Sequence, residues 1–182
     1  MQIITGKYRA RKLVAVDSLE TRPTLARVKE SIFNLIADKI EDKIVLDLFA
    51  GSGAYGIECI SRGSKEVFFV DQSEKAIKVI QTNTQRISEK FEILKLGFVD
   101  ALNQFQKRNL KFDLVFLDPP YDSDYVLKSL NILKEKQLLN NGAIIVVEHK
   151  LANDLQNLPE CYIIKKSRKY GIAFVDILEF EE

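Results

Sequence analysis

Short apolar runs alternate with longer amphipathic stretches along most of the chain. We expect the apolar runs, which are rich in branched and aromatic residues, to form buried strands at residues 44–49, 66–71, 91–96, 112–118 and 143–148. The amphipathic stretches predict helices at residues 54–62, 74–88, 100–107, 123–138 and 150–157. Continuous apolar strands separated by helices indicate an α/β protein, in which a doubly wound, mostly parallel sheet carries helices on both faces.

The C-terminal end departs from this alternation. Two strand-like runs, at residues 162–166 and 172–180, are separated by a basic stretch with Gly171 and by no helix. Consecutive strands without a crossover helix are typical of a hairpin. We therefore expect a C-terminal antiparallel hairpin, which brings the sheet to seven strands.

The N-terminal end has a third pattern. Residues 2–16 have the pattern of short strands or an extended arm, and residues 21–36 predict a helix with Pro23 near its first turn. The apolar residues that share one face of this helix are Val28, Ile32, Phe33 and Ile36. We expect residues 1–40 to be a small N-terminal extension packed on a main domain of residues 41–182.

Composition places the chain among ordinary globular proteins. Its 182 residues are 46% hydrophobic and 29% charged, which suits one domain with a full core. The longest apolar stretch, residues 143–147, is far shorter than the roughly 20 residues of a membrane span, and no secretory signal is expected. Two distant cysteines and a single histidine, His149, argue against a disulfide framework, a metal site or a Ser-His-Asp triad. We expect a cytoplasmic monomer.

Basic side chains gather at the two ends of the chain, although the net charge is only +1. The N-terminal group consists of Lys7, Arg9, Arg11 and Lys12, followed by Arg22, Arg27 and Lys29. The C-terminal group consists of Lys165, Lys166, Arg168 and Lys169. Such groups can contact the phosphates of a nucleic acid without reading its base sequence.

A glycine-rich loop follows the first strand of the main domain. Gly51, Gly53 and Gly56 form a G-x-G-x-x-G pattern between a strand and a helix, and Asp71 ends the next strand. Glycines in such a loop allow a sharp turn and a close approach of the backbone to a ligand, while the acid can bind ribose hydroxyls. The combination predicts a site for a nucleotide-like cofactor.

Two further acids bear on which cofactor is bound. Asp47, four residues before Gly51, would repel the pyrophosphate of NAD but attract the ammonium and sulfonium of S-adenosylmethionine. The chain is also too short for the separate substrate domain of most dehydrogenases. Asp100 is expected near the adenine amino group, the alternative being a helix N-cap. The predicted cofactor-binding set is completed by Phe49, Gln72 and Ala101.

The fourth expected strand ends in Asp118, Pro119, Pro120 and Tyr121, at the edge of the sheet where open α/β proteins bind ligands. One interpretation is a stiff loop, because proline fixes φ and cannot continue a strand. With a methyl-donor loop upstream we favour a catalytic site for methylation of an exocyclic amine. Asp118 and the rigid carbonyl of Pro119 would accept its N–H bonds, and Tyr121 would stack on the base.

Nearly the whole chain resembles the RsmD-type methyltransferases of bacterial small-subunit ribosomal RNA, which methylate guanine N2. The resemblance rests on the opening pattern M-x-I-I-x-G-x-x-R-x-x-K-L, the block R-P-T-x-x-R-V-K-E-S-I-F-N at residues 22–34, D-L-F-A-G-S-G-A-Y-G and D-P-P-Y. Many amino-methyltransferases share the last two motifs, whereas the arginine-bearing block is far more restricted. The resemblance implies a Rossmann-like fold and S-adenosylmethionine as cofactor.

The same resemblance implies a substrate. It points to a guanine of 16S ribosomal RNA, at hairpin-loop position 966, presented in a partly or fully assembled small subunit. The residues expected near the target are Arg22, Pro23, Thr24 and Arg27, with a solvated helix start as the alternative. The residues expected to hold RNA phosphates are Arg9, Arg11, Lys166 and Arg168. Two other functions stay open: N6-adenine methylation of DNA or RNA, and nucleotide or RNA binding without catalysis.

Overall fold

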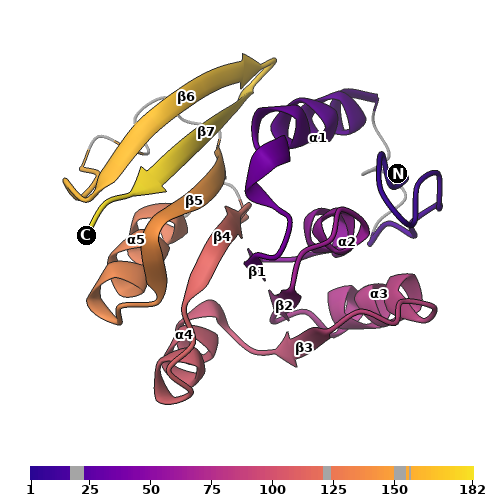
Figure 1. Cartoon of the computed structure of the whole chain (residues 1–182), viewed down its shortest axis with the longest axis horizontal. Coiled ribbons are helices and arrows are strands. Elements are labelled where there is room, and N and C mark those ends of the chain that lie inside the picture. Colours follow the sequence, from indigo (N-terminus) through magenta and orange to yellow (C-terminus); the bar gives the residue numbers. More distant parts are fainter. Residues whose placement is uncertain (17–22, 121–123, 150–154, 156) are drawn as a thin grey trace.

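One mixed sheet of seven strands forms the centre of the part of the chain that the structure describes (Figure 1). This computed structural model describes residues 1–16, 23–120, 124–149, 155 and 157–182. The strands, in sheet order, are β3 (Phe91–Lys95), β2 (Glu66–Asp71), β1 (Ile44–Leu48), β4 (Phe112–Leu117), β5 (Leu139–His149), β7 (Ala173–Phe180) and β6 (Tyr162–Tyr170). The helices are α1 (Pro23–Leu35), the short 3-10 helix η2 (Ala37–Lys39), α2 (Ala54–Ser61), α3 (Glu74–Thr84), α4 (Phe98–Lys107) and α5 (Tyr125–Glu135).

The sheet topology confirms the predicted fold class. β1 pairs in parallel with β2 and β4, and the pairs β2–β3 and β4–β5 are also parallel. β7 runs antiparallel to both β5 and β6, so the C-terminal hairpin lies at one edge of the sheet. The strand order reverses between β1 and β4, and in Rossmann-like sheets this is the position where ligands bind.

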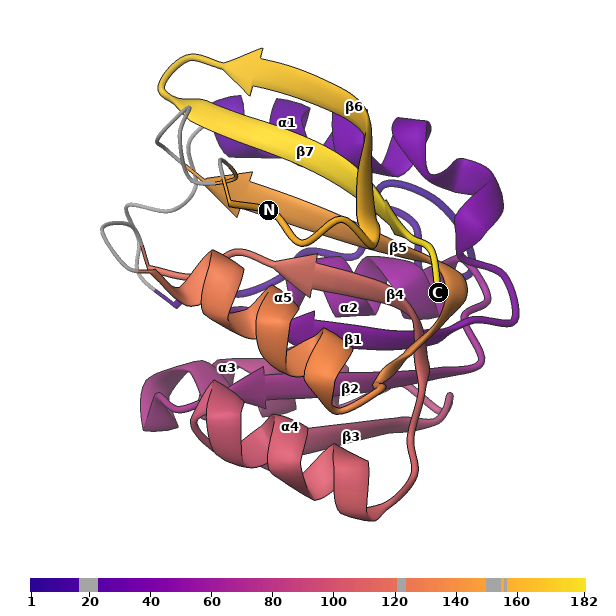
Figure 2. The same cartoon turned by 90° about the vertical axis from the view of Figure 1, so that its left-hand side faces the viewer.

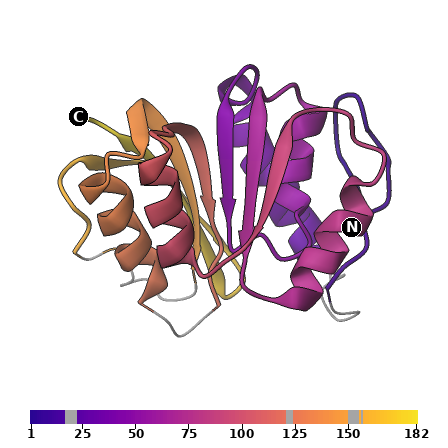
Figure 3. The same cartoon turned by 90° about the horizontal axis from the view of Figure 1, so that it is seen from below.

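Helices cover both faces of the sheet, and each face has its own apolar core (Figure 3). α1, α2 and α3 pack on one face through side chains such as Phe33 and Ile57. α4 and α5 pack on the other through side chains such as Phe105 and Leu130. None of the helices that the structure describes combines the length and apolar character of a membrane span.

The central strands alternate between these two cores. On β4, Phe116 faces the core under α1–α3 and Leu117 faces the core under α4 and α5. On β5, Val146 and Val147 follow the same order, and they pair with Phe116 and Leu117 respectively. Side chains at equal positions along β4 and β5 therefore lie side by side on the same face.

The helix α1 confirms the pattern expected for the N-terminal region. Pro23 is its first residue, where the missing N–H of proline costs nothing. The four apolar residues assigned to one face, Val28, Ile32, Phe33 and Ile36, are each at most 2% exposed. The helix therefore packs on the sheet through the face that its sequence indicates.

Several strand boundaries differ from the expected ones. β5 begins at Leu139 rather than at residue 143, because residues 139–143 pass through an irregularity of the β4–β5 ladder, where Gly142 has a φ of 78°. β6 extends to Tyr170, although we expected it to end at residue 166. Its side chains are exposed along almost the whole strand, so an edge strand of this kind needs no apolar run.

Helix ends differ as well. α4 begins at Phe98, two residues before the expected start, because Gly97 takes the extended N-cap conformation. α3 ends at Thr84 rather than residue 88, and α5 spans Tyr125–Glu135 rather than residues 123–138. The helix expected at residues 150–157 lies almost entirely outside the described residues.

Residues 1–14 form an arm that folds back on itself and packs against α2. An isolated antiparallel bridge between Gln2 and Lys12 closes the arm, which agrees with the extended arm rather than with the short strands considered above. The Lys7 N–H donates to the Ser61 carbonyl at the end of α2, over 2.8 Å. Gly6 has a φ of 89°, and a Cβ at this position would lie 1.8 Å from the same carbonyl oxygen. Only glycine therefore lets the arm approach the helix end so closely.

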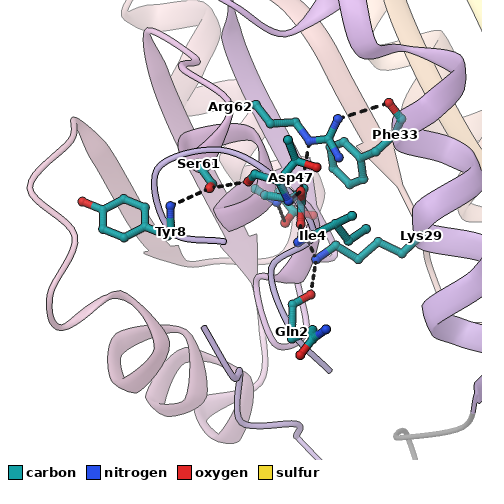
Figure 4. A network of polar contacts seen from close by, with 11 residues as sticks. Gln2, Ile4, Tyr8, Lys29, Phe33, Asp47, Ser61 and Arg62 are labelled. Carbon is teal, nitrogen blue, oxygen red and sulfur yellow. Dashed lines mark hydrogen bonds and ion pairs between the residues drawn. The ribbon is translucent and has the colours of Figure 1, made fainter. Parts of the chain in front are cut away.

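The carboxylate of Glu58 joins the arm to two helices, and Figure 4 shows three of the residues that contact it, Ile4, Lys29 and Arg62. Glu58 lies on α2 with no exposed surface, and it accepts backbone N–H bonds from Ile4 at 2.8 Å and Thr5 at 3.1 Å. It also contacts Lys29 Nζ of α1 at 2.9 Å and Arg62 Nε at 3.0 Å. Burial by itself raises the pKa of this carboxyl, but the Lys29 charge and the hydrogen bonds outweigh burial and lower it. An ionised carboxylate therefore holds these segments together.

We predict that Glu58→Gln lowers the free energy of unfolding by about 3 kcal/mol, because it leaves buried positive charge without a compensating carboxylate. The control is Glu92→Gln, which breaks the exposed Glu92–Arg108 ion pair at 2.8 Å and should cost less than about 1 kcal/mol. Urea unfolding of both variants measures the difference. Equal losses in the two variants would contradict a central role of the Glu58 cluster.

Candidate functional site

A cavity of about 910 Å³ opens at the carboxyl edge of the parallel strands. Figure 2 shows β1, β2, β4 and β5 ending on the same side of the molecule. Residues that follow β1, β2, β3 and β4 line the cavity, together with parts of α1, of α2 and of the β6–β7 turn. The cavity thus lies where the strand order reverses, which is the position expected for a ligand site.

The glycine loop after β1 forms one wall, and its three glycines have different roles. Gly51 lines the cavity with a φ of 53°, and a Cβ on it would meet nothing within 4 Å, so its backbone is open to a ligand. Gly53 is the N-cap of α2 with a φ of 75°. A Cβ on Gly56 would lie 2.3 Å from Phe69 Cε1, so this glycine lets α2 pack closely on β2. Gly51 is therefore the member of the motif that can contact a ligand.

Asp71 lies beside this loop at the end of β2, as expected. Its Oδ2 accepts the Gly51 N–H at 2.9 Å, and its Oδ1 accepts the Ser73 N–H at 2.8 Å. Both Asp71 and the neighbouring Gln72 line the cavity. The two backbone bonds orient the Asp71 carboxylate, which has further acceptor capacity for ribose hydroxyls.

Asp47 binds the backbone of the glycine motif and does not belong to the described cavity wall. It is 2% exposed, and its Oδ2 accepts the Gly56 N–H at 2.9 Å. Burial raises the pKa of Asp47 to about 7, although the Gly56 bond acts in the opposite direction. The sequence predicts that this carboxylate lies close to the cofactor. In the structure it is buried behind the cavity wall, where its bond to Gly56 positions the motif.

The segment after β3 differs from the expectation in its details. Asp100 is exposed on the first turn of α4 and is not its N-cap, which is Gly97. Ala101 is fully buried in the core. Among the described residues, the cavity wall at this point consists of Leu96, Gly97, Phe98 and Val99. The structure therefore brings the predicted segment to the cavity, but through the residues before Asp100 and Ala101.

Three aromatic rings form a further part of the wall. Phe49 stacks on Tyr125 with ring centroids 6.0 Å apart, and Phe98 lies 5.3 Å from Phe49 and 5.0 Å from Tyr125. Phe49 has a φ of 70°, a strained conformation for a residue other than glycine. Its N–H and that of Ala50 both donate to the Val70 carbonyl, which holds this conformation. Strain maintained at a cavity wall is typical of a functional position.

The end of β4 provides the acidic part of the cavity. Asp118, the buried Pro119 and the exposed Pro120 all line it, as the sequence predicted, while Tyr121 lies outside the described residues. Beside them, the Tyr55 ring of α2 stacks on Phe116 with centroids 5.0 Å apart.

Glu148 of β5 completes this group. The Tyr55 hydroxyl donates to Glu148 Oε2 over 3.1 Å, and the side chain of Glu148 is almost fully buried in the cavity wall. Burial, followed by the charges of Glu148 and Asp118, raises the pKa of Tyr55 well above its ordinary value. Tyr55 therefore stays protonated and acts as a hydrogen-bond donor.

The helix α1 and the β6–β7 turn cover the cavity. Val28 and Lys29 of α1 line it, and so do Tyr170 and Ile172 of the turn. A hydrogen bond between the hydroxyls of Ser31 and Tyr170 connects the two elements. α1 thus contacts the arm through the Glu58 cluster and the hairpin through Ser31.

None of the predicted RNA-binding residues that the structure describes belongs to the described cavity wall. Arg27 is exposed on α1 next to Val28, and Lys166 and Arg168 are exposed on β6. Arg9 is exposed on the arm, whereas Arg11 is half-buried, with its guanidinium 6.0 Å from the centre of the Tyr8 ring. Arg22 lies outside the described residues, and Pro23 and Thr24 form the start of α1. The structure does not gather these residues into one cluster.

Several cavity residues were not assigned to the site by the sequence. They come from five helices and strands, which tertiary packing brings together: Lys29, Tyr55, Tyr125, Glu148 and Tyr170. Two of them lie within motifs that could have drawn attention to them, Lys29 in the block at residues 22–34 and Tyr55 in D-L-F-A-G-S-G-A-Y-G. Within the described ranges, no group of three or more His, Cys, Asp or Glu side chains could hold a metal ion.

Comparison with known proteins agrees with this architecture. A family model described as conserved hypothetical protein 95 matches residues 1–179. Ribosomal RNA small subunit methyltransferase D of Haemophilus influenzae is 35% identical over 176 residues, which cover 95% of this chain and 90% of that protein. The chain belongs to this family, the RsmD family.

Other relatives of this RsmD-family chain are similar over its full length. YlbH of Bacillus subtilis, described as a candidate rRNA methyltransferase, is 36% identical over 179 residues, which cover 97% of both chains. The structure of yhhF from Escherichia coli, described as a candidate methyltransferase, has a TM-score of 0.86 at 26% identity and covers 100% of this chain and 98% of that one. The fold is therefore one that the family shares.

Close packing at the RsmD-family glycine loop leads to a stability prediction. Gly56→Ala should lower the free energy of unfolding by about 1–3 kcal/mol, since its Cβ would overlap the Phe69 ring. Gly97→Ala is the matched control, because the first atom its Cβ would meet is Asp100 Oδ2 at 4.0 Å. This control should change stability by less than about 0.5 kcal/mol in urea unfolding. A tolerated Gly56→Ala would refute the packing role.

Asp47 should make stability depend on pH. Its pKa rises from the ordinary 3.8 to about 7 on folding, so the stability that protonated Asp47 contributes is fully present below about pH 4 and is lost as pH rises through about 7. We predict that Asp47→Asn gains stability relative to the original protein over this window, by up to about 4 kcal/mol. Urea unfolding at a series of pH values tests this. A difference that does not vary with pH would contradict it.

Proposed function

We propose that this chain is an S-adenosylmethionine-dependent methyltransferase that methylates the exocyclic N2 of a guanine in the RNA of the small ribosomal subunit. The main support for the proposal lies at the end of β4. Asp118 and Pro119 follow this buried strand and line a large cavity together with the glycine loop. Relatives named as rRNA methyltransferases support it. The hairpin-loop position 966 is the target that family resemblance implies.

The residues of the cavity suit S-adenosylmethionine. Gly51 offers open backbone, Asp71 is an oriented acceptor for ribose hydroxyls, and the aromatic wall around Phe49 and Phe98 can pack against adenine. The carboxylates of Asp118 and Glu148 favour a cationic ligand over a pyrophosphate. When bound, S-adenosylmethionine would supply the methyl group. The electrons of the broken S–C bond stay on sulfur, and the nitrogen lone pair forms the new N–C bond.

Asp118 and Pro119 orient the amine. An exocyclic nitrogen is a poor nucleophile because its lone pair is conjugated with the ring. Hydrogen bonds from its two N–H groups to the Asp118 carboxylate and the Pro119 carbonyl aim the lone pair and reduce this conjugation. Asp118 can also take the proton that the nitrogen releases. Tyr121, by the same proposal, stacks on the base.

The surface around the cavity is suited to RNA. Exposed Arg27 on α1, with Lys166 and Arg168 on β6, borders the elements that cover the cavity, and basic side chains there can hold phosphates. Arg9 and Arg11 lie on the arm, whose neighbouring residue Lys7 is bound to the C-terminal end of α2, and they would hold phosphates farther from the target base. The proposed substrate is a small-subunit particle, bound by a monomer in the cytoplasm, with the target base turned out of its stack into the cavity.

We predict that Asp118→Asn lowers the rate of methyl transfer at saturating S-adenosylmethionine at least about 100-fold, because it removes an acceptor of the amine. The assay uses labelled S-adenosylmethionine, small subunits from a strain that lacks the gene, and nucleoside mass spectrometry. Asp38→Asn is the control, since the Asp38 side chain is 75% exposed on η2, and it should behave as the original protein.

Three outcomes would overturn the proposed function. Label in N6-methyladenosine would indicate an adenine methyltransferase. The absence of any transfer would favour a binding protein without catalysis. Thermal stabilisation by NAD rather than by S-adenosylmethionine would contradict the cofactor assignment.

A further inference from the structure

Two carboxylates lie at matching positions on neighbouring strands. Leu117 of β4 pairs with Val147 of β5 in a parallel ladder, so the next residues are Asp118 and Glu148. Neighbouring strands run roughly 4.8 Å apart. Because Phe116 and Val146 face the core under α1–α3, the alternation directs Asp118 and Glu148 to that same face. Both residues line the cavity, so the two carboxylates form adjacent parts of one wall.

The position of Glu148 is constrained by its surroundings. The residue is 4% exposed, and Tyr55 donates a hydrogen bond to its Oε2 at 3.1 Å. The Tyr55 ring is itself held against Phe116, with an angle of 7° between the ring planes. A carboxylate accepts about four hydrogen bonds, so the Tyr55 bond is compatible with further bonds to a ligand. Glu148 is therefore an oriented acceptor at a fixed place beside Asp118.

The hydrogen-bonding edges of the two candidate bases differ at the atom next to the amine. In guanine, the N2 amine adjoins N1–H, so the edge presents two neighbouring donors. In adenine, the N6 amine adjoins N1 with a lone pair, so a donor adjoins an acceptor. A pair of neighbouring carboxylates matches the first edge, whereas the second edge would place a lone pair against a carboxylate.

We propose that Glu148 determines the base specificity of the enzyme by accepting the N1–H of guanine while Asp118 accepts an N–H of the N2 amine. This assignment rests on the proposed function and deepens it. Tyr55 acts as a positioning residue that orients the Glu148 carboxylate. The site thus selects guanine through a second acceptor, and it disfavours adenine because Glu148 would face the adenine N1 lone pair.

A substrate analogue removes the N1–H contact. 2-Aminopurine keeps the 2-amino group but has a lone pair at N1 and a hydrogen in place of O6, so it offers the methyl acceptor without the donor that Glu148 would bind. The variant Glu148→Gln separates the two differences, because it changes only the partner proposed for N1. The test compares small subunits reconstituted with RNA that carries guanine or 2-aminopurine at the methylated position. The unmodified enzyme should favour guanine in kcat/KM by roughly 10- to 150-fold, the range expected for a hydrogen bond to a charged group.

The variant Glu148→Gln should change this preference. A glutamine amide can donate to the N1 lone pair of 2-aminopurine, so the guanine preference should fall at least about tenfold. A change in the affinity for S-adenosylmethionine cancels from this ratio, because both substrates use the same cofactor. Tyr55→Phe, which removes the hydroxyl but keeps the stacked ring, should lower kcat/KM and retain a preference for guanine. These readouts separate base selection from a purely structural role of Glu148.

Two results would overturn the inference. One is an equal decline of guanine and 2-aminopurine methylation in Glu148→Gln, which indicates a structural role. The other is an unmodified enzyme that methylates both bases equally well, and this measurement does not depend on the folding of any variant. Failure of the proposed function is recognised separately, because the unmodified enzyme would then transfer no methyl group to guanine N2.

Discussion

The buried carboxylate of Glu58 is the contact on which the shape of the cavity depends. Its four partners belong to the N-terminal arm, to α1 and to α2, and none of these segments can move away without leaving a buried charge uncompensated. Lys29 is both a partner of Glu58 and a residue of the cavity wall. The Glu58–Lys29 ion pair, which stabilises the fold, therefore also sets the position of Lys29 in the cavity wall.

The opposite wall depends on the register of the sheet. Leu48 of β1 pairs with Leu117 of β4, which pairs with Val147 of β5, so these parallel ladders fix the positions of the glycine loop, Asp118 and Glu148 relative to one another. Acidic groups lie on this inner side, whereas Arg27 is exposed on α1 and Lys166 and Arg168 are exposed on β6. This distribution of charge matches the two ligands proposed, because carboxylates attract a cationic cofactor and exposed basic side chains attract RNA phosphates.

Much of the fold could be predicted from the sequence, because the buried strands are continuous apolar runs and α1 has a clear apolar face. The extent of β6 could not, since a strand exposed along its length has no such pattern. For the cavity wall, Gly51, Asp71 and Asp118 could be predicted because each follows a strand within a motif. Glu148 and Tyr55 could not, because strand register and ring stacking bring them to the wall. Asp100 lies outside the described wall, on the first turn of a helix whose N-cap is Gly97.

The aromatic composition of the cavity has a practical consequence. The chain contains six tyrosines and no tryptophan, and the described wall of the cavity includes Tyr55, Tyr125 and Tyr170. Intrinsic ultraviolet emission of this protein therefore originates from tyrosine, with a share from rings that stack on Phe116 and Phe49 at the ligand site. Ligand binding at the cavity can therefore be followed through the tyrosine emission, without an attached dye.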